Sequence, residues 1–389
     1  MHFAAIAIAV LSLLIWLGIV FFSGHFWKIW VSDADQQTIP SISRWPRVVA
    51  VVPARNEAVT ITTTLASLTA QDYRGEFSTL IIDDHSEDGT AELACKAAAD
   101  RGAANRVRVV SAPVLAPGWT GKLWALQAGV EMATESAPEF FWFTDADIVH
   151  APKTLEQLVS RAERDGLDLT SLMVLLEAQS FAEKLIIPAF LYFFLMLYPP
   201  RWIANRKSRT AGAAGGCILL RRTALERIGG LAAIRSQVID DCSLARFVKR
   251  SGGAIWMGLT RRSVSLRRYL GFGELRGMIA RTAFTQLNYS ALQLAGALIG
   301  LVVTFVAPVV LALSSDPRIW LSALLAWCLM SASFLPTVVF YRLSPIWSPF
   351  LPVAATFYLY ATCLSAVRYW LGRGGQWKGR AQAPTGRGE

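Results

Sequence analysis

The sequence predicts an α/β domain, built on a mostly parallel sheet, that is carried between apolar segments long enough to cross a membrane. Two observations lead to this fold class. In the middle of the chain, short apolar strands alternate with helix-length stretches, which is typical of a parallel sheet with helices on its faces. At the two ends of the 389-residue chain, an apolar excess raises the mean hydropathy to +0.39, which indicates transmembrane helices at both termini.

The first element is an apolar run from Phe3 to Phe22, 20 residues without a charge. This length is enough for a helix to cross a bilayer, and Lys28 and Arg44 follow it. A cleaved signal peptide is the alternative, but the run is longer than an ordinary signal core and no cleavage site stands out. We therefore expect a transmembrane helix in residues 1–25 and a linker in residues 26–46.

Four apolar strands are expected next, and polar clusters follow three of them. The strands are Arg47–Val52, Ser78–Asp83, Val107–Ser111 and Phe140–Thr144. PARNE follows the first strand, DDHSEDGT the second and DAD the fourth. Ligands in such sheets bind beyond the carboxyl ends of the strands, so these loops are where we expect the site. The whole domain is expected to cover residues 47–282.

Asp145 and Asp147 stand one residue apart at the end of the fourth strand. Carboxylates on the same side of a strand end repel each other unless a cation lies between them, and Mg²⁺ or Mn²⁺ commonly joins such groups to substrate phosphates. The structural alternative is that Asp147 caps a helix opening near Pro152, and this motif alone favours neither interpretation. His150 is expected to be an exposed turn residue rather than a metal ligand.

Two further acidic clusters favour the functional interpretation. Asp83 and Asp84 lie between a strand and a helix that is expected to begin near Thr90. Asp240 and Asp241 stand at the start of another helix. Helix capping does not readily explain three acidic clusters at the loops of one sheet.

The remaining apolar segments predict more contacts with a membrane. A short run, Ile186–Pro200, predicts a helix near residues 184–201 that lies in the membrane interface or is buried in the core. Two or three spans are expected within residues 283–371, from the runs Leu292–Leu313, Ile319–Tyr341 and Ile346–Val367. Three spans would place the basic tail, residues 372–389, opposite the domain, against the positive-inside tendency. Either one segment is interfacial or re-entrant, or the tendency is broken here.

The net charge of +10 and the five cysteines bear on partners and compartment. Because many cations flank apolar segments, as in the stretch from Arg201 to Arg209, anionic lipid headgroups explain them better than nucleic acid does. The cysteines form no CxxC pair, so neither a disulfide framework nor a zinc site is expected, which suits a reducing cytoplasm. The sequence does not indicate an oligomeric state.

Over roughly Val48 to Arg281 the motifs occur in the order PARNE, DDxSxDGT, GK with ALQAG, DAD, GGxxLxRR and DD. This order resembles that of the family 2 glycosyltransferases of the GT-A fold. Longer runs such as PGWTGKLWAL and IDDCSLARFVKR are similar to the hopene-associated glycosyltransferases, and ceramide glucosyltransferases are more distant. The resemblance implies a metal-dependent hexosyltransferase, using Mn²⁺ or Mg²⁺, that inverts the sugar's configuration. The implied donor is a nucleotide sugar, expected to be a UDP-sugar, and the implied acceptor is a lipid, with a hopanoid expected.

The resemblance also assigns roles to residues. The positions that match nucleotide-sugar-binding residues are Pro53, Arg55, Glu57, Asp84, Lys122, Asp145 and Arg281. Asp145 and Asp147 match the metal-binding pair, and Asp241 matches the general base that takes the acceptor's proton. The positions on the acceptor side are Gly215, Gly216 and Asp240.

One departure concerns the stretch after the base, where many membrane-bound relatives carry (Q/R)xxRW. This chain has Met278 and Thr282 at the outer positions, so only Arg281 remains. Arg281 is expected to meet the diphosphate, although a solvated or headgroup-facing arginine fits the sequence equally well. The missing tryptophan argues against acceptor handling borrowed from the ceramide or polysaccharide synthases. Transfer to another lipid, such as a polyprenyl phosphate, carotenoid or sphingolipid, is the alternative to a hopanoid.

An alternative of another class is an inactive GT-A scaffold in a lipid pathway. The intact acidic motifs favour the enzyme. The location that the resemblance implies is the bacterial cytoplasmic (inner) membrane, in a multi-pass protein whose catalytic domain faces the cytoplasm.

Overall fold

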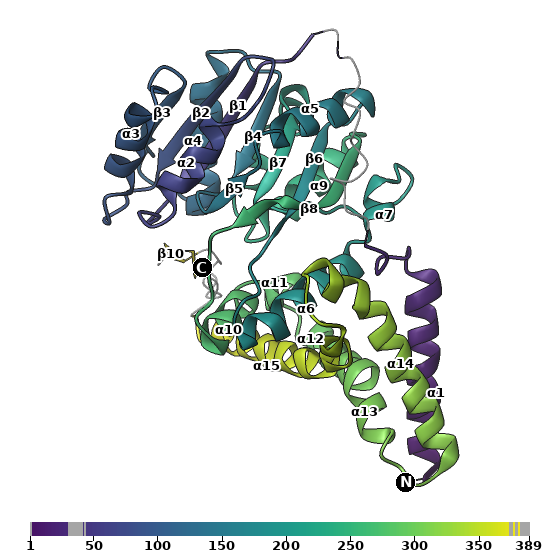
Figure 1. Ribbon diagram of the computed structural model, residues 1–389. Helices are drawn as coiled ribbons and strands as arrows, with labels where there is room; N and C mark the ends of the chain where they lie inside the picture. The colour runs from purple at the N-terminus through teal and green to yellow at the C-terminus, as the bar shows by residue number, and fades with distance from the viewer. Residues whose placement is uncertain (1, 30–41, 43, 373–375, 378–379, 382–389) are drawn as a thin grey trace.

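The computed structural model describes residues 2–29, 42, 44–372, 376–377 and 380–381. A globular α/β domain sits on a helical part that extends away from it (Figure 1). Much of the expected linker and most of the expected basic tail lie outside the described residues.

An eight-stranded sheet forms the centre of the domain, in the order β3-β2-β1-β4-β7-β6-β8-β5. The strands are β1 (Val48–Ala54), β2 (Phe77–Asp83), β3 (Val107–Ser111), β4 (Phe140–Thr144), β5 (Ile148–His150), β6 (Leu169–Leu175), β7 (Cys217–Arg221) and β8 (Ile255–Ser265). β1, β2, β3 and β4 are mutually parallel, as are β6 and β8, whereas β7 and β5 run antiparallel to their neighbours. The prediction of a mostly parallel sheet is confirmed, and so are the four expected strands.

Helices cover both faces of this sheet. On one face lie α2 (Ile61–Thr69), α3 (Thr90–Asp100) and α5 (Thr154–Arg164), and on the other lie α4 (Gly121–Thr134) and α9 (Asp240–Arg250). Successive strand residues point to opposite faces, so Val51 joins the core under α4 and Val52 joins the core under α2. Gly129 allows α4 to approach β1, because a Cβ atom there would lie 2.3 Å from Val51 Cγ1.

Short helices connect the later strands: α7 (Pro200–Ala204), α8 (Arg222–Arg227) and η1 (Leu231–Ile234). The expected helix starts near Thr90 and at Asp240 are confirmed. α5 begins at Thr154 without a side-chain cap, so the alternative role of Asp147 as its cap is wrong.

The helical part contains α1 (His2–Phe22), α6 (Phe181–Leu197), α10 (Phe272–Ala280), α11 (Ala283–Gln286), α12 (Ala291–Leu301), the π-helical turn η2 (Val302–Val306), α13 (Ala307–Leu311), α14 (Pro317–Phe340), η3 (Pro345–Phe350) and α15 (Leu351–Trp370). Five segments of the described chain are long and apolar enough to cross a membrane: His2–Phe22, Phe181–Ala204, Ala291–Leu311, Pro317–Phe340 and Pro345–Trp370. The α4 face of the sheet shares one continuous core with α1, α6, α14 and α15. Buried hydrogen bonds also tie the helices together, from Trp16 Nε1 to Thr304 O at 2.7 Å and between Tyr192 Oη and Ser333 Oγ at 2.7 Å.

Candidate active site

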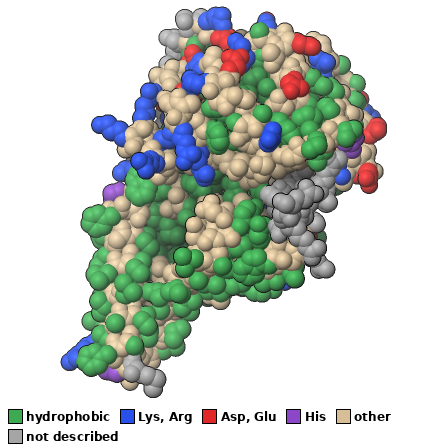
Figure 2. Space-filling view, turned by 180° about the vertical axis from the view of Figure 1, so that it is seen from behind, with side chains coloured by type: hydrophobic (Ala, Val, Ile, Leu, Met, Phe, Trp, Pro, Cys, Tyr) green, Lys and Arg blue, Asp and Glu red, His purple; other side chains and the backbone are tan. Residues whose placement is uncertain are grey.

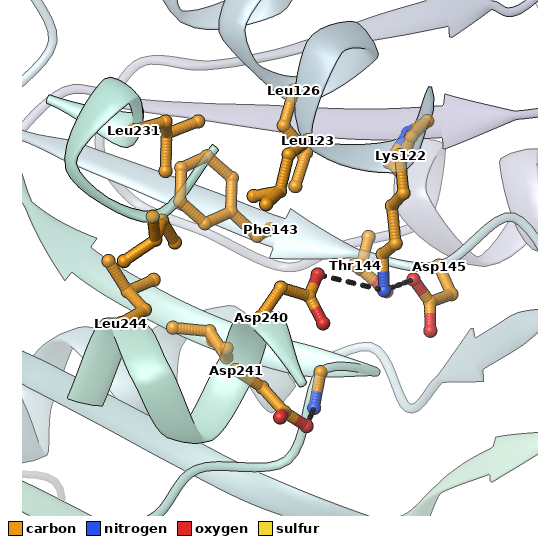
Figure 3. Close-up of a pocket in the computed structure, with 14 residues that line it drawn as sticks. Lys122, Leu123, Leu126, Phe143, Thr144, Asp145, Leu231, Asp240, Asp241 and Leu244 are labelled. Carbon is orange, nitrogen blue, oxygen red and sulfur yellow. Dashed lines mark hydrogen bonds and ion pairs between the residues drawn. The ribbon is translucent and has the colours of Figure 1, made fainter. Parts of the chain in front are cut away.

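Six of the predicted site residues line a cavity of about 20 Å³ at the carboxyl ends of β1 and β4. They are Pro53, Lys122, Asp145, Gly215, Asp240 and Asp241. β1, the first turn of α4, the loop after β4, the loop before β7 and the first turn of α9 supply them. The other walls are largely apolar, as Leu123, Phe143 and Leu231 show in Figure 3. We call this space the inner cavity, and its volume suits one water molecule or hydroxyl group.

Lys122 holds the carboxylates of the inner cavity together. Its Nζ atom lies 2.7 Å from Asp145 Oδ1 and 3.7 Å from Asp240 Oδ2 (Figure 3). Burial by itself would lower the pKa of Lys122, but the charges of Asp145, Asp240 and Asp241 outweigh burial and raise it. Lys122 is therefore a permanent cation that stands among three acidic residues.

Asp241 is fixed by two backbone N–H groups. Gly215 N donates to Oδ2 at 2.9 Å, and Cys242 N donates to Oδ1 at 2.7 Å. Burial and the neighbouring Asp240 raise the pKa of Asp241 to about 6, although the two N–H groups and Lys122 act in the opposite direction. A carboxylate of this pKa is ionised at neutral pH and still basic enough to accept a proton.

A larger cleft of about 960 Å³ lies between the domain and the helices α10, α11 and α15. We call it the outer cleft. Three predicted residues line it: Glu57, Asp147 and Arg281. Burial and the charges of Asp145 and Glu57 raise the pKa of Asp147 to about 6, whereas Arg267 and Lys122 lower it. Asp147 thus faces the outer cleft and interacts electrostatically with residues of the inner cavity.

Arg55, Asp84 and Gly216 line neither space. Asp84 is fully buried, and its Oδ2 atom lies 3.5 Å from Arg55 Nη1, which also donates to Asp84 O. Gly216 O accepts a hydrogen bond from Thr144 Oγ1 at 2.9 Å. The acidic loops therefore converge only in part, because Asp241 and Asp147 line neighbouring spaces and Asp84 lines neither of them.

The described residues contain no group of three or more His, Cys, Asp or Glu side chains placed to hold a metal ion. Mg²⁺ often takes only one or two protein carboxylates and completes its shell with substrate phosphates and water. Asp147 fits that pattern, since burial and then the charges of Asp145 and Glu57 raise its pKa, and a bound cation would offset both effects. Asp145 can contribute the oxygen that Lys122 does not contact.

The expectation that His150 is an exposed turn residue is wrong. His150 belongs to β5 and is 2% exposed, and burial lowers its pKa to about 3. Its Nε2 atom lies 2.8 Å from Thr144 Oγ1 and its Nδ1 atom 2.8 Å from Ser263 Oγ. Since Thr144 donates to Gly216 O, it accepts from Nε2–H. Neutral His150 therefore braces the strand end that carries Asp145.

Sequence reasoning missed the part that Arg267, Arg268 and Tyr269 take in the outer cleft. They directly follow β8, a strand that was not expected, so their place at a strand end could not be seen. The buried carboxylate of Glu183 fixes this loop, because its Oε1 atom accepts from Tyr269 N at 2.8 Å. The sequence signal that could have pointed to this part of the cleft is the pair of arginines next to a tyrosine.

Comparisons with known proteins agree with this fold. Residues 49–229 match the family model of glycosyl transferase family 2. The mannosyltransferase PcManGT from Pyrobaculum calidifontis, in complex with GDP-Man and Mn²⁺, is similar at 20% identity with a TM-score of 0.56, over 93% of this chain and 99% of that chain. Glucosyl-3-phosphoglycerate synthase from Mycobacterium tuberculosis shows 20% identity and a TM-score of 0.41, over 62% of this chain and 79% of that chain.

None of the curated proteins matched the sequence. The family match covers the strands and loops that supply Pro53, Lys122, Asp145 and Gly215, and the similarity to the mannosyltransferase supports the fold. Residues 49–229 therefore match a glycosyl transferase family 2 domain, the fold is GT-A, and the chain is a glycosyltransferase.

Proposed function

We propose that this protein is a membrane-bound, metal-dependent, inverting glycosyltransferase that moves a sugar from a nucleotide donor to a lipid. The two walls of the outer cleft carry this proposal. The domain supplies charged residues such as Glu57 and Asp147. α11 and α15 supply mainly aromatic and aliphatic ones, such as Phe284 and Leu364, with Arg368 among them. A cleft of this kind suits a polar donor that meets an amphiphilic acceptor at the membrane surface.

The donor diphosphate is assigned to the charged side of the outer cleft. Arg267 follows β8 and Arg281 follows α10, both line the cleft, and guanidinium groups bind phosphate oxygens well. A bound divalent ion would neutralise charge that develops on the leaving diphosphate. Asp147 and Asp145 would hold that ion, and Lys122 would add a fixed positive charge beside it.

The acceptor hydroxyl is assigned to the inner cavity, next to Asp241. Asp241 takes the hydroxyl proton while the acceptor oxygen forms a bond to the anomeric carbon and the bond from that carbon to the diphosphate oxygen breaks. One displacement of this kind inverts the anomeric configuration. The N–H groups of Gly215 and Cys242 keep the carboxylate oriented, which reduces the entropy cost of the step.

A hopanoid is the acceptor and a UDP-sugar the donor that the motif resemblance implies, so we propose both. We also place the protein in a bacterial cytoplasmic membrane, with its catalytic domain on the cytoplasmic side. Polyprenyl phosphate, carotenoid and sphingolipid are the competing acceptors.

The direct test incubates membranes that contain the protein with labelled UDP- and GDP-sugars and Mn²⁺ or Mg²⁺. We expect label in an extracted lipid, loss of label on chelation of the metal, and release of nucleoside diphosphate. Mass spectrometry of the labelled lipid separates a neutral hopanoid from an acid-labile polyprenyl phosphate. Label only in water-soluble products would contradict the lipid acceptor, and no turnover with any donor would favour the inactive scaffold.

A further inference from the structure

Two of the five segments that could cross a membrane begin and end beside the catalytic domain. The first is α15, which follows α14 through η3. The end of α14 rests on the domain, because Arg261 of β8 donates to Phe340 O at 2.9 Å and to Val339 O at 3.3 Å. α15 therefore starts on the domain side.

The other end of α15 also lies on the domain side. Ser365 Oγ donates to Ala280 O of α10 at 2.5 Å and accepts from Phe284 N of α11 at 3.1 Å. Arg368 and Tyr369 line the outer cleft together with Asp147. A helix of 20 residues is ~30 Å long, enough to cross, yet α15 runs across the foot of the domain and at a steep angle to α14 (Figure 1).

The second such segment is α6, which starts soon after β6 and ends at α7. Its first turn is tied to the domain by Glu183, which accepts from Tyr269 N at 2.8 Å. Beyond its last turn, Lys249 of α9 donates to Ile203 O at 2.7 Å and to Trp202 O at 3.0 Å. Both ends of α6 are thus fixed to the domain.

The other three segments run away from the domain (Figure 1). At their far end, His2 Nε2 of α1 lies 2.6 Å from Asp316 Oδ2, which precedes α14. Partway along, Trp16 Nε1 donates to Thr304 O of η2 at 2.7 Å. α1, α14 and the continuous segment α12–η2–α13 therefore form one bundle directed away from the sheet.

α15 has two different faces along its length. Ala354, Ala355, Ala361 and Ala366 are buried against the rest of the protein. Val353, Tyr360, Val367 and Trp370 are exposed and recur at helical spacing on the opposite side. An uncovered apolar stripe with Tyr and Trp suits the boundary between lipid headgroups and acyl chains.

Basic residues lie where the catalytic domain meets the helical part. Four exposed cations follow the end of α6: Arg201, Arg206, Lys207 and Arg209. Figure 2 shows Lys and Arg side chains gathered where the domain meets the apolar helical part. Anionic headgroups attract such clusters within a Debye length of the surface.

We propose, on the basis of the membrane association proposed above, that α6 and α15 lie along the membrane surface on the catalytic side. The exposed stripe of α15 contacts the near leaflet, and among the five candidate segments of the described chain only α1, α12–η2–α13 and α14 cross. With three crossings, the N-terminus is on the far side and the C-terminus is on the catalytic side. The basic tail and the domain then share one side, as the positive-inside tendency requires.

The first test places single cysteines on either side of sealed vesicles and labels them with a membrane-impermeant maleimide. The native Cys95 of α3 is exposed and reports the side of the catalytic domain. In a background without the other cysteines, we expect Glu389→Cys to label from the same side as Cys95, and His2→Cys from the opposite side. Labelling of Glu389→Cys together with His2→Cys would overturn the proposal.

The second test measures depth with nitroxide labels and paramagnetic relaxation by oxygen and a nickel chelate. Val353→Cys, Tyr360→Cys and Val367→Cys should lie at one shallow depth, although the outer two are ~21 Å apart along the helix. Leu321→Cys, the native Cys328 and Val339→Cys in α14 should show a gradient that deepens in the middle. A similar gradient in α15 would overturn the surface position. Removal of the whole protein by carbonate washing would instead contradict the membrane association itself.

Discussion

Lys122 Nζ lies 2.7 Å from Asp145 Oδ1 and thereby joins the first turn of α4 to the loop after β4. The same ammonium group reaches Asp240 Oδ2 at 3.7 Å. One cation thus stands among three carboxylates, those of Asp145, Asp240 and Asp241. Because three carboxylates surround one ammonium group, the inner cavity keeps a net negative charge. This charge favours the binding of a further cation beside a diphosphate.

Lys122→Met should destabilise the protein and change its pH dependence. Removal of one partner of a buried pair usually costs about 3–5 kcal/mol, and we expect on the order of 2–3 because Asp145 remains 34% exposed. The pKa of Asp241 should rise further without the ammonium, so the acid limb of the transfer rate should move to higher pH. Thermal unfolding in detergent and the pH profile measure the two effects.

Lys153→Met is the matched control for that experiment. Its ammonium lies 3.9 Å from Asp72 Oδ2, with exposures of 58% and 66%. A surface pair of this kind contributes ~0–1 kcal/mol. Equal losses of stability in the two variants would contradict the central position given to Lys122.

Gly215→Ala should impair transfer more than stability. A Cβ atom there would lie 3.3 Å from Asp241 Oδ2 and 3.4 Å from Lys122 Nζ, so these two groups must shift slightly. We expect kcat to fall at least tenfold while the melting temperature changes by only a few degrees. Gly273→Ala in α10 is the control, because a Cβ atom there meets no atom within 4 Å and should leave kcat unchanged.

His150 should contribute a specific pH dependence of stability. Its pKa is lowered to about 3 in the fold, against an ordinary value of 6.5, so the unfolded chain binds more protons between these pH values. Stability from this residue is therefore lost as the pH falls through that window, by up to ~1.4 kcal/mol per pH unit. The gap in stability between wild type and His150→Gln should narrow from pH 7 to pH 4. A gap that is constant over this range in unfolding curves would contradict the assignment.

Glu183→Ala should weaken both the fold and the binding of the donor. Its carboxylate accepts from the N–H groups of Gln179, Ser180 and Tyr269, and buried donors left without an acceptor cost about 1–3 kcal/mol. The loop of Tyr269 also carries Arg267, which is assigned to the donor diphosphate, so the KM for the donor should rise more than the KM for the lipid. Glu226→Ala, which removes an exposed pair with Arg222, should change neither constant. An unchanged donor KM in Glu183→Ala would remove the loop from donor binding.

The sequence foretold the first half of the sheet because β1 to β4 are short apolar runs that end in polar loops. β5 to β8 were not foreseen. β7, for example, pairs antiparallel with both β4 and β6, and so lies outside the alternation of parallel strands and helices on which the prediction rested. His150 was misjudged for a related reason, since its burial depends on Thr144 and on Ser263 of β8. Contacts between residues distant in sequence leave no local pattern.

The functional site, like the sheet, could be predicted from the sequence only in part. Residues at strand ends and helix starts, such as Lys122, Asp145 and Asp241, meet in one cavity. The outer cleft could not be foreseen, because it forms only where Asp147 faces α15, whose place across the foot of the domain depends on packing. Motif order indicates which loops gather, and tertiary packing decides which spaces they enclose.

The central claim is that Asp241 removes the acceptor's proton. The most direct measurement compares wild type and Asp241→Asn in lipid glycosylation under single-turnover conditions, together with donor affinity in the presence of Mn²⁺. We expect transfer to fall by ~10²–10⁴-fold while donor affinity changes less than threefold. Transfer at a rate near that of the wild type would contradict the account.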